Sequence, residues 1–230
     1  MRLSVIIPTL NESAHLAATL ESVLAHLPPD AEVLVCDGGS TDTTADIAAR
    51  YPVRLIHAPT RGRAAQMNFA AAQAQGELLF FLHADCHPPA QYANKITAAV
   101  RNGKTAGCFR YRFDSPRLLL RAQAWCIRFP GILFRGGDQT LFITRELFTR
   151  IGGFNETYVV MEDYDIIRRI RRIGSFAILP DLAVVSARKY QHNSWLAVNF
   201  ANAVAMTMFL SGRFSPNHIR VTYHRLIRHR

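Results

Sequence analysis

The sequence has few cysteines and lacks the spacing that would give them a structural or metal-binding role. Its four cysteines are scattered along the 230 residues with no C-x-x-C pair: Cys36, Cys86, Cys108 and Cys126. This pattern indicates neither a zinc site nor a disulfide framework. We therefore expect reduced thiols, most of them buried.

Two common phosphate-binding motifs are also missing. The sequence contains no G-x-G-x-x-G and no G-x-x-x-x-G-K-[ST], which counts against a dinucleotide site or a P-loop. It has no repeat period and no low-complexity tract, and 49% of its residues are apolar against 19% charged. Length and composition together predict one ordered α/β domain with a substantial core.

Long hydrophobic runs are scarce. The apolar run at the N-terminus is too short for a signal-peptide core and ends at Pro8, which predicts a cytoplasmic protein. A charge-free stretch between Lys189 and Arg213 is at the lower length limit for a membrane span, and Asn199 and Asn202 interrupt it. A helix that packs on the domain or lies on a membrane surface is favoured over one that crosses.

Acidic residues are absent after Asp181, whereas arginines continue to the C-terminus. The net charge is +10, and much of the excess lies in this region. Such a charge would suit nucleic acid, anionic lipid or a phosphorylated substrate. We interpret residues 191–230 as a basic C-terminal helical segment that follows a domain of residues 1–190.

Strand and helix patterns alternate over the first hundred residues. β-branched runs predict strands, and amphipathic runs predict the helices between them. The expected strands are 4–7, 32–36, 53–57 and 78–82, and the expected helices are 13–26, 43–50, 63–75 and one that ends at 101. This order predicts a mainly parallel sheet flanked by helices, whose ligands bind beyond the carboxyl ends of the strands.

The turn after the second expected strand, residues 37–42, combines carboxylates with two glycines. One interpretation is a tight turn in which Ser40 or Asp42 caps the next helix. The other is a nucleotide contact, because a carboxylate such as that of Asp37 can accept from a ribose hydroxyl or a base N–H. The residues alone leave both open.

A second polar pair follows the fourth expected strand. His83 and Asp85 are spaced by one residue, so a buried strand delivers both to the same side of the chain. Mg²⁺ and Mn²⁺ prefer carboxylate and diphosphate oxygens and often take only one or two protein carboxylates. Asp85 fits that role, although a capping Asp before Pro88 would look similar.

Adjacent carboxylates open a helical pattern that ends at Gly174. Acids in its first turn and arginines in its last complement the helix dipole, so part of this pattern has a structural reason. That reason does not require both Glu162 and Asp163. One of them could act as the general base that deprotonates an acceptor hydroxyl.

The order of these motifs resembles that of the family 2 glycosyltransferases, which have the GT-A fold. The matching segments are 4–12, 37–42, 83–85, 152–154 and 162–163. A narrower set is similar to the small bacterial glycosyltransferases associated with radical-SAM and arsenosugar biosynthesis genes. That set comprises residues 62–68, 81–85, 137–139, 186–188 and 213–216.

This resemblance implies a GT-A fold with a Rossmann-like nucleotide-sugar-binding half at 1–103 and an acceptor and catalytic half at 104–190. Asp163 would be the catalytic base with Glu162 beside it, and Asp85 would hold Mg²⁺ or Mn²⁺. The implied nucleotide-sugar-binding residues are Pro8, Leu10, Glu12, Asp37, Gly39, Arg63, Gln66, His83, Ala84, Asp85 and Arg188. The acceptor residues would be Gly137, Asp138 and Gln139, with an ordinary turn as the alternative.

The chain departs from the family pattern at two positions. Gly38 stands where many members have a second Asp, and His83 replaces the first Asp of D-x-D. The Q-x-x-R-W motif of processive members is absent as well. The resemblance therefore implies a single, inverting, metal-dependent sugar transfer from a UDP- or GDP-linked donor to a hydroxyl acceptor of unknown identity.

Two rival functions remain at this point. A nucleotidyltransferase should have a Gly-rich basic loop after the first strand, which this chain lacks. A module that binds nucleic acid or an anionic membrane through the basic tail leaves Asp85, Glu162 and Asp163 unexplained, so no nucleic-acid partner is expected. Peripheral contact with the cytoplasmic membrane face stays open, as does the oligomeric state.

Overall fold

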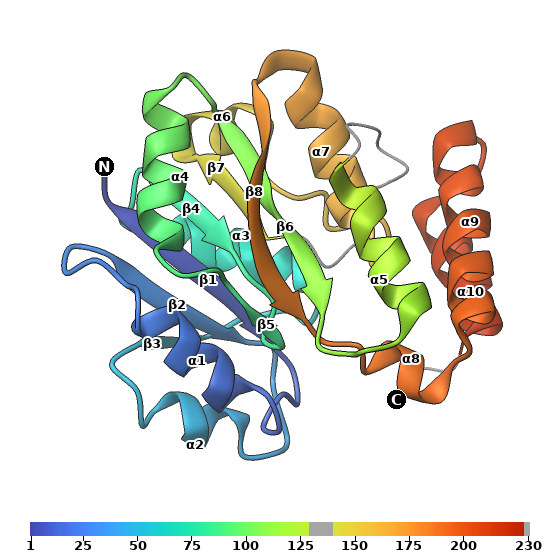
Figure 1. Cartoon of the computed structure of the whole chain (residues 1–230), viewed down its shortest axis with the longest axis horizontal. Helices are drawn as coiled ribbons and strands as arrows, with labels where there is room; N and C mark the ends of the chain where they lie inside the picture. Colours follow the sequence, from blue (N-terminus) through green and yellow to red (C-terminus); the bar gives the residue numbers. More distant parts are fainter. Residues whose placement is uncertain (129–139, 228–230) are drawn as a thin grey trace.

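The computed structural model describes residues 1–128 and 140–227. This part of the chain contains one sheet of eight strands flanked by helices (Figure 1). The strands lie in the order β3-β2-β1-β4-β7-β6-β8-β5. Their bounds are β1 (Leu3–Thr9), β2 (Glu32–Asp37), β3 (Arg54–His57), β4 (Leu78–Phe81), β5 (Cys86–His87), β6 (Ala106–Phe113), β7 (Leu141–Thr144) and β8 (Phe176–Val185). Four of the strand pairings are parallel and three are antiparallel.

The first half of the sheet is parallel, as the sequence predicts. β1 pairs with β2 and β4, and β2 pairs with β3. Every residue of β1 and β4 is buried, because helices cover both faces of these strands. These helices are α1 (Leu16–Leu24), α2 (Thr44–Ala48), α3 (Arg63–Gln73) and α4 (Tyr92–Arg101), which confirms the expected helices with ends shifted by a few residues.

Two apolar layers enclose this half. Alternate strand residues such as Val5 and Phe80 face one layer, which includes α1 and α4. Their neighbours Ile6 and Phe81 face the other, where α3 packs together with later helices. This alternation follows from the two-residue repeat of a strand. Because β1, β2 and β4 are parallel, their carboxyl ends meet at one edge of the sheet.

The second half of the chain extends the same sheet. β7 pairs antiparallel with β4 and β6, and β6 then pairs in parallel with β8, with an irregularity between Phe109 and Arg110. The sequence patterns did not predict these strands. The helices of this half are α5 (Leu118–Trp125), α6 (Arg145–Arg150) and α7 (Glu162–Ile173), with a short 3₁₀ turn at Cys126–Arg128.

The C-terminal segment is helical, as predicted. It contains α8 (Lys189–His192), α9 (Trp195–Ser211) and α10 (Pro216–Leu226), and α9 and α10 lie side by side (Figure 1). Their buried side chains form an apolar cluster with Met161, directly before α7. Over residues 1–128 and 140–227, no helix is both long and apolar enough to cross a membrane.

The burial of the thiols gives a first testable prediction. Cys36, Cys86 and Cys108 are buried and Cys126 is half-buried. Burial, with a smaller contribution from the Asp37 charge, raises the pKa of Cys36 to about 12, so its reactive thiolate is scarce at neutral pH. We expect an alkylating reagent to modify only Cys126 in the native protein and all four thiols after unfolding, as measured by peptide mass spectrometry. Rapid native modification of Cys36 would contradict this.

Candidate active site

Two arginines connect the polar residues at the carboxyl edge of the sheet. Arg188, from the segment after β8, lies between Glu12 and Asp85. Arg63, at the start of α3, lies between His83 and the acids that open α7. The structure thus brings together the predicted donor, metal and base residues from five separate segments.

Arg188 forms a two-sided clamp. Its Nη1 and Nη2 atoms donate to the two carboxylate oxygens of Glu12 at 2.7 and 2.8 Å, and its Nε donates to Oδ2 of Asp85 at 2.9 Å. Such bidentate, charge-assisted contacts are among the stronger hydrogen bonds in proteins. The structure thus pairs Arg188 with the predicted donor residue Glu12 and the predicted metal residue Asp85.

Arg63 contacts both candidate bases. Its Nε donates to Oε1 of Glu162 at 2.6 Å, and its Nη2 lies 3.2 Å from Oδ2 of Asp163 and also contacts Glu162. The Glu162 side chain is 1% exposed, whereas that of Asp163 is 14% exposed. Of the two acids, Asp163 is therefore the more accessible to a substrate.

His83 lies between the two guanidinium groups. The Nη1 atom of Arg63 is 3.4 Å from both ring nitrogens. Burial, followed by the charges of Arg63 and Arg188, holds the pKa of His83 well below its ordinary value. The imidazole is accordingly neutral at neutral pH and retains a lone pair that can act as an acceptor or a metal ligand.

The protein groups around Asp85 fit a divalent cation that arrives with phosphate. Within residues 1–128 and 140–227, no group of three or more His, Cys, Asp or Glu side chains could hold a metal ion. Asp85 nevertheless offers a hard carboxylate oxygen close to the neutral His83. Mg²⁺ is commonly bound by one or two carboxylates plus substrate phosphates, and this donor set matches that pattern.

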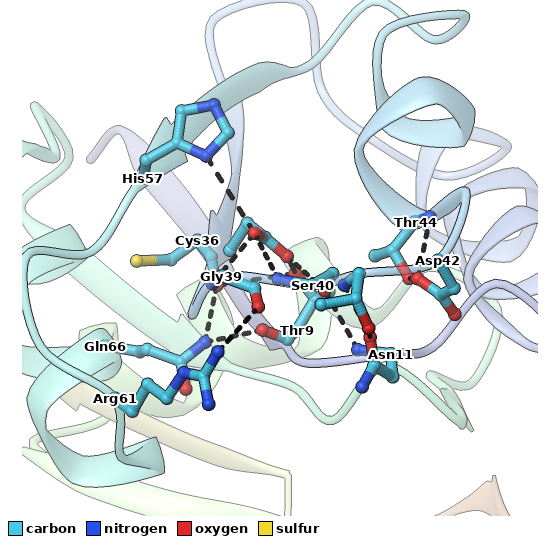
Figure 2. Close-up of polar contacts among 12 residues, drawn as sticks. Thr9, Asn11, Cys36, Gly39, Ser40, Asp42, Thr44, His57, Arg61 and Gln66 are labelled. Atoms are coloured by element: carbon cyan, nitrogen blue, oxygen red, sulfur yellow. Dashed lines mark hydrogen bonds and ion pairs between the residues drawn. The ribbon is translucent and has the colours of Figure 1, made fainter.

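The carboxylate of Asp37 organises its own turn, whose residues Gly39 and Ser40 lie close to Thr9 in Figure 2. Its Oδ2 accepts from the main-chain N–H groups of Gly39 and Ser40 at 3.0 and 2.9 Å, and its Oδ1 accepts from Thr9. Burial alone would raise the pKa of Asp37, but hydrogen bonds from Ser40, Gly39 and Thr9 lower it below the ordinary value. Asp37 therefore holds the expected tight turn, but the helix that follows has Thr43 at its N-cap rather than Ser40 or Asp42. Contact of Asp37 with a nucleoside stays a prediction.

Gln66 gives a physical reason for Gly38. The buried Gln66 amide donates to the main-chain carbonyls of Thr9 and Cys36, both at 2.7 Å, and so ties the ends of β1 and β2 together (Figure 2). A Cβ atom at position 38 would lie 2.9 Å from Cδ of Gln66. The side chain of Gln66 thus occupies the space that an Asp at this position would need.

The remaining predicted donor residues flank the same edge. Pro8 and Ala84 are buried, and the carbonyl of Ala84 accepts from the Thr19 hydroxyl at 2.7 Å, which fixes the loop before Asp85. Leu10 and Gly39 are exposed near the start of the loops that follow β1 and β2. No structural observation bears on the roles that the resemblance gave them.

A cavity of about 310 Å³ opens beside Asp163. Its polar and aromatic lining includes six side chains to which the sequence gave no role, together with Lys189 and His224: Tyr111, Gln123, Tyr164, Tyr190, Asn202 and Tyr223. They come from β6, α5, α7, α8, α9 and α10, which no sequence motif connects. The predicted acceptor residues, Gly137, Asp138 and Gln139, lie outside the described residues.

The sequence over residues 4–159 matches the model of a known family, Glycosyl transferase family 2. The chain belongs to this family. It is 33% identical to a PGL/p-HBAD biosynthesis glycosyltransferase of Mycobacterium tuberculosis over 187 residues, which cover 70% of this chain and 66% of that one. It is also 33% identical to the succinoglycan biosynthesis protein ExoA of Rhizobium meliloti, over 74% of this chain and 58% of that one. The chain thus spans less than two thirds of the length of these relatives.

Solved glycosyltransferases share the fold. A mannosyltransferase from Pyrobaculum calidifontis, PcManGT, in complex with GDP-Man and Mn²⁺, is similar over 97% of this family 2 chain and 69% of its own, with a TM-score of 0.71 and 23% identity. TarS of S. aureus in complex with UDP-GlcNAc is similar over 98% of this chain and 71% of its own, with a TM-score of 0.67 and 18% identity. The expected GT-A fold is confirmed, including the C-terminal helices.

Proposed function

We propose that this glycosyltransferase moves one sugar from a nucleoside-diphosphate sugar to an acceptor hydroxyl, with inversion at the anomeric carbon. The observation that carries the proposal is the contact of Arg63 with both Asp163 and His83. His83 is two residues from the metal candidate Asp85, so one guanidinium joins the expected donor side to the expected base. An in-line displacement places the attacking hydroxyl and the leaving diphosphate on opposite sides of the anomeric carbon, so the base and the diphosphate site must lie within reach of one sugar.

The donor is proposed to be linked to UDP or GDP. Support comes from the two solved neighbours, one bound to GDP-Man with Mn²⁺ and the other to UDP-GlcNAc. The nucleoside would lie against the turns after β1 and β2, and the diphosphate would lie near Arg63 and Arg188. Fixed positive charges there would stabilise the charge that develops on the leaving diphosphate.

A cation supports the same step. Mg²⁺ or Mn²⁺, held by Asp85 with His83 nearby, would neutralise charge on the diphosphate as a Lewis acid. Arg188 already contacts Asp85, so donor binding requires this guanidinium to share Asp85 or to turn toward the phosphate oxygens. In either position its charge stays beside the leaving group.

Asp163 is proposed to take the proton from the attacking hydroxyl. It lines the cavity of about 310 Å³, which offers aromatic and polar groups suited to an acceptor. Glu162 is almost fully buried against Arg63 and positions that guanidinium, so it is assigned no proton transfer. A single transfer, and the resemblance to the radical-SAM and arsenosugar-associated subgroup, rest on sequence motifs alone and are part of the proposal.

Calorimetry with UDP and GDP, each with and without Mn²⁺, tests the donor and the metal. For the preferred nucleotide we expect Mn²⁺ to strengthen binding by at least about tenfold, or ~1.4 kcal/mol. Asp85→Ala should remove this gain because it deletes the carboxylate ligand. Asp181→Ala is the matched control, since Asp181 pairs with Lys95 elsewhere on the surface. Equal binding with and without Mn²⁺, or a gain that survives Asp85→Ala, would remove the metal from the proposal.

A further inference from the structure

A larger cavity, of about 860 Å³, lies between α5 and the strands β6 and β8. It shares only Tyr111 with the described lining of the cavity beside Asp163. Four arginines line it, and we call it the arginine groove: Arg110, Arg112, Arg121 and Arg128. The sugar-transfer proposal uses none of them.

The charge of the arginine groove is unbalanced. Asp114 is the one carboxylate among its described lining residues, and its Oδ1 accepts from the main-chain N–H of Ala187 at 2.7 Å. Within the described residues, no ion pair joins any of the four arginines to an acid. The Nε atom of Arg110 is buried and has no hydrogen-bond partner there. A buried donor of this kind indicates a missing acceptor, which an anion would supply.

The rim of the groove is apolar. Trp125 and Leu182 line it with 52% and 50% of their surface exposed, and the Arg128 guanidinium lies 4.5 Å from the Trp125 ring centre. On the same helix α5, Leu118 and Leu119 are 75% and 56% exposed. A small anion in water needs no such rim, whereas an amphiphile does.

The neighbouring helix α9 also carries exposed apolar side chains. Trp195 of α9 donates from Nε1 to Oε1 of Gln123 on α5 at 2.9 Å, so the two helices are adjacent. Leu196 and Phe200 on α9 are 72% and 62% exposed. The sequence has no acid between Asp114 and Asp138 and none after Asp181, so neither α5 nor α9 carries a negative side chain. Exposed Trp, Leu and Phe beside arginines are typical of protein surfaces that lie in a membrane interface.

We propose that the arginine groove binds the phosphate of an anionic phospholipid in a bilayer, while the exposed apolar side chains of α5 and α9 enter the head-group region. This inference goes beyond the sugar transfer and does not depend on it. It has a consequence for the acceptor, because Gln123 of α5 and Asn202 of α9 also line the cavity beside Asp163. Docking through these helices would bring that cavity close to the lipid surface.

Vesicle co-sedimentation of the full chain tests the proposal. The probes are vesicles of phosphatidylcholine alone and of phosphatidylcholine with phosphatidylglycerol. We expect binding to the anionic vesicles only, and a loss of about tenfold or more in the variant with Arg110→Gln and Arg112→Gln, since each guanidinium near an anionic surface contributes severalfold. Leu118→Ser with Leu119→Ser should also weaken binding. Arg101→Gln with Lys104→Gln is the matched control, because both residues are exposed basic groups outside the groove lining.

Several results would overturn the proposal. Equal binding to both vesicle types, or unchanged binding of a folded Arg110 and Arg112 variant, would exclude the groove as a lipid site. Inorganic phosphate that binds the groove when vesicles do not would assign it to a free anion. Light scattering that shows a dimer, lost in the Leu118 and Leu119 variant, would assign the apolar surface to a second copy. Circular dichroism melting of each variant establishes that it is folded.

Discussion

Asp163→Asn is expected to reduce sugar transfer by about 10²–10⁴-fold, because an amide cannot accept the acceptor proton. The substitution keeps the size of the side chain and an oxygen that can still accept from Arg63. Nucleotide binding, measured by calorimetry, should therefore stay nearly intact. The rate of transfer at saturating donor gives the direct measurement.

Glu162→Gln is the matched variant for this experiment. Glu162 is adjacent, contacts the same arginine and is 1% exposed, so any loss of transfer should come with a loss of stability or donor binding. A folded Asp163→Asn protein with unchanged turnover would exclude Asp163 as the base. If Glu162→Gln alone abolished transfer in a folded protein that still bound the donor nucleotide, the role would pass to Glu162.

Arg63→Met is expected to lower the free energy of unfolding by about 2 kcal/mol, because it leaves the buried Glu162 carboxylate without its guanidinium. Breaking a fully buried pair costs more, but Arg63 is 38% exposed and water offsets part of the loss. The same substitution should weaken donor binding, since it removes a positive charge from the proposed diphosphate site. Urea unfolding and nucleotide calorimetry measure the two effects.

A double-mutant cycle measures the interaction between Arg63 and Glu162 apart from their contacts with other residues. Combining Arg63→Met with Glu162→Gln should recover part of the lost stability, because the amide leaves no buried charge without a partner. It should not recover donor binding. Arg172→Met, in the exposed last turn of α7, is the control for removal of an arginine. An additive cycle, with no recovery, would mean that Arg63 and Glu162 do not depend on each other.

The donor half of the molecule could be predicted from sequence because its information is local. Each strand of the parallel half is a short apolar run with a polar turn after it, and topology places those turns at one edge. Asp85 follows β4 at this edge, whereas Asp163 opens helix α7, and the roles proposed for both acids stay predictions. The prediction did not extend to how they are held, because Arg63 and Arg188 reach them across large sequence separations.

The cavity beside Asp163 could not be predicted because its lining residues have no common local pattern. Tyr111 lies on a strand, Gln123 on a helix that packs beside it, and Asn202 on another helix much later in the chain. Only tertiary packing places them around one cavity. The structural role of Gln66 could not be predicted either. Its hydrogen bonds to two main-chain carbonyls require that residue 38 has no side chain.

The position of β6 within the sheet has a consequence for how the chain is synthesised and folded. β6 lies between β7 and β8, and its parallel partner β8 leaves the ribosome only after α5, β7, α6 and α7 have been made. Until then one edge of β6 is unpaired, and such edges are prone to aggregation. Arg110 and Arg112 lie on that strand with Tyr111 between them. Charged residues on an unpaired strand edge discourage its association with other chains. Their replacement by apolar residues should therefore lower the yield of folded protein during expression more than it lowers the stability of the finished fold.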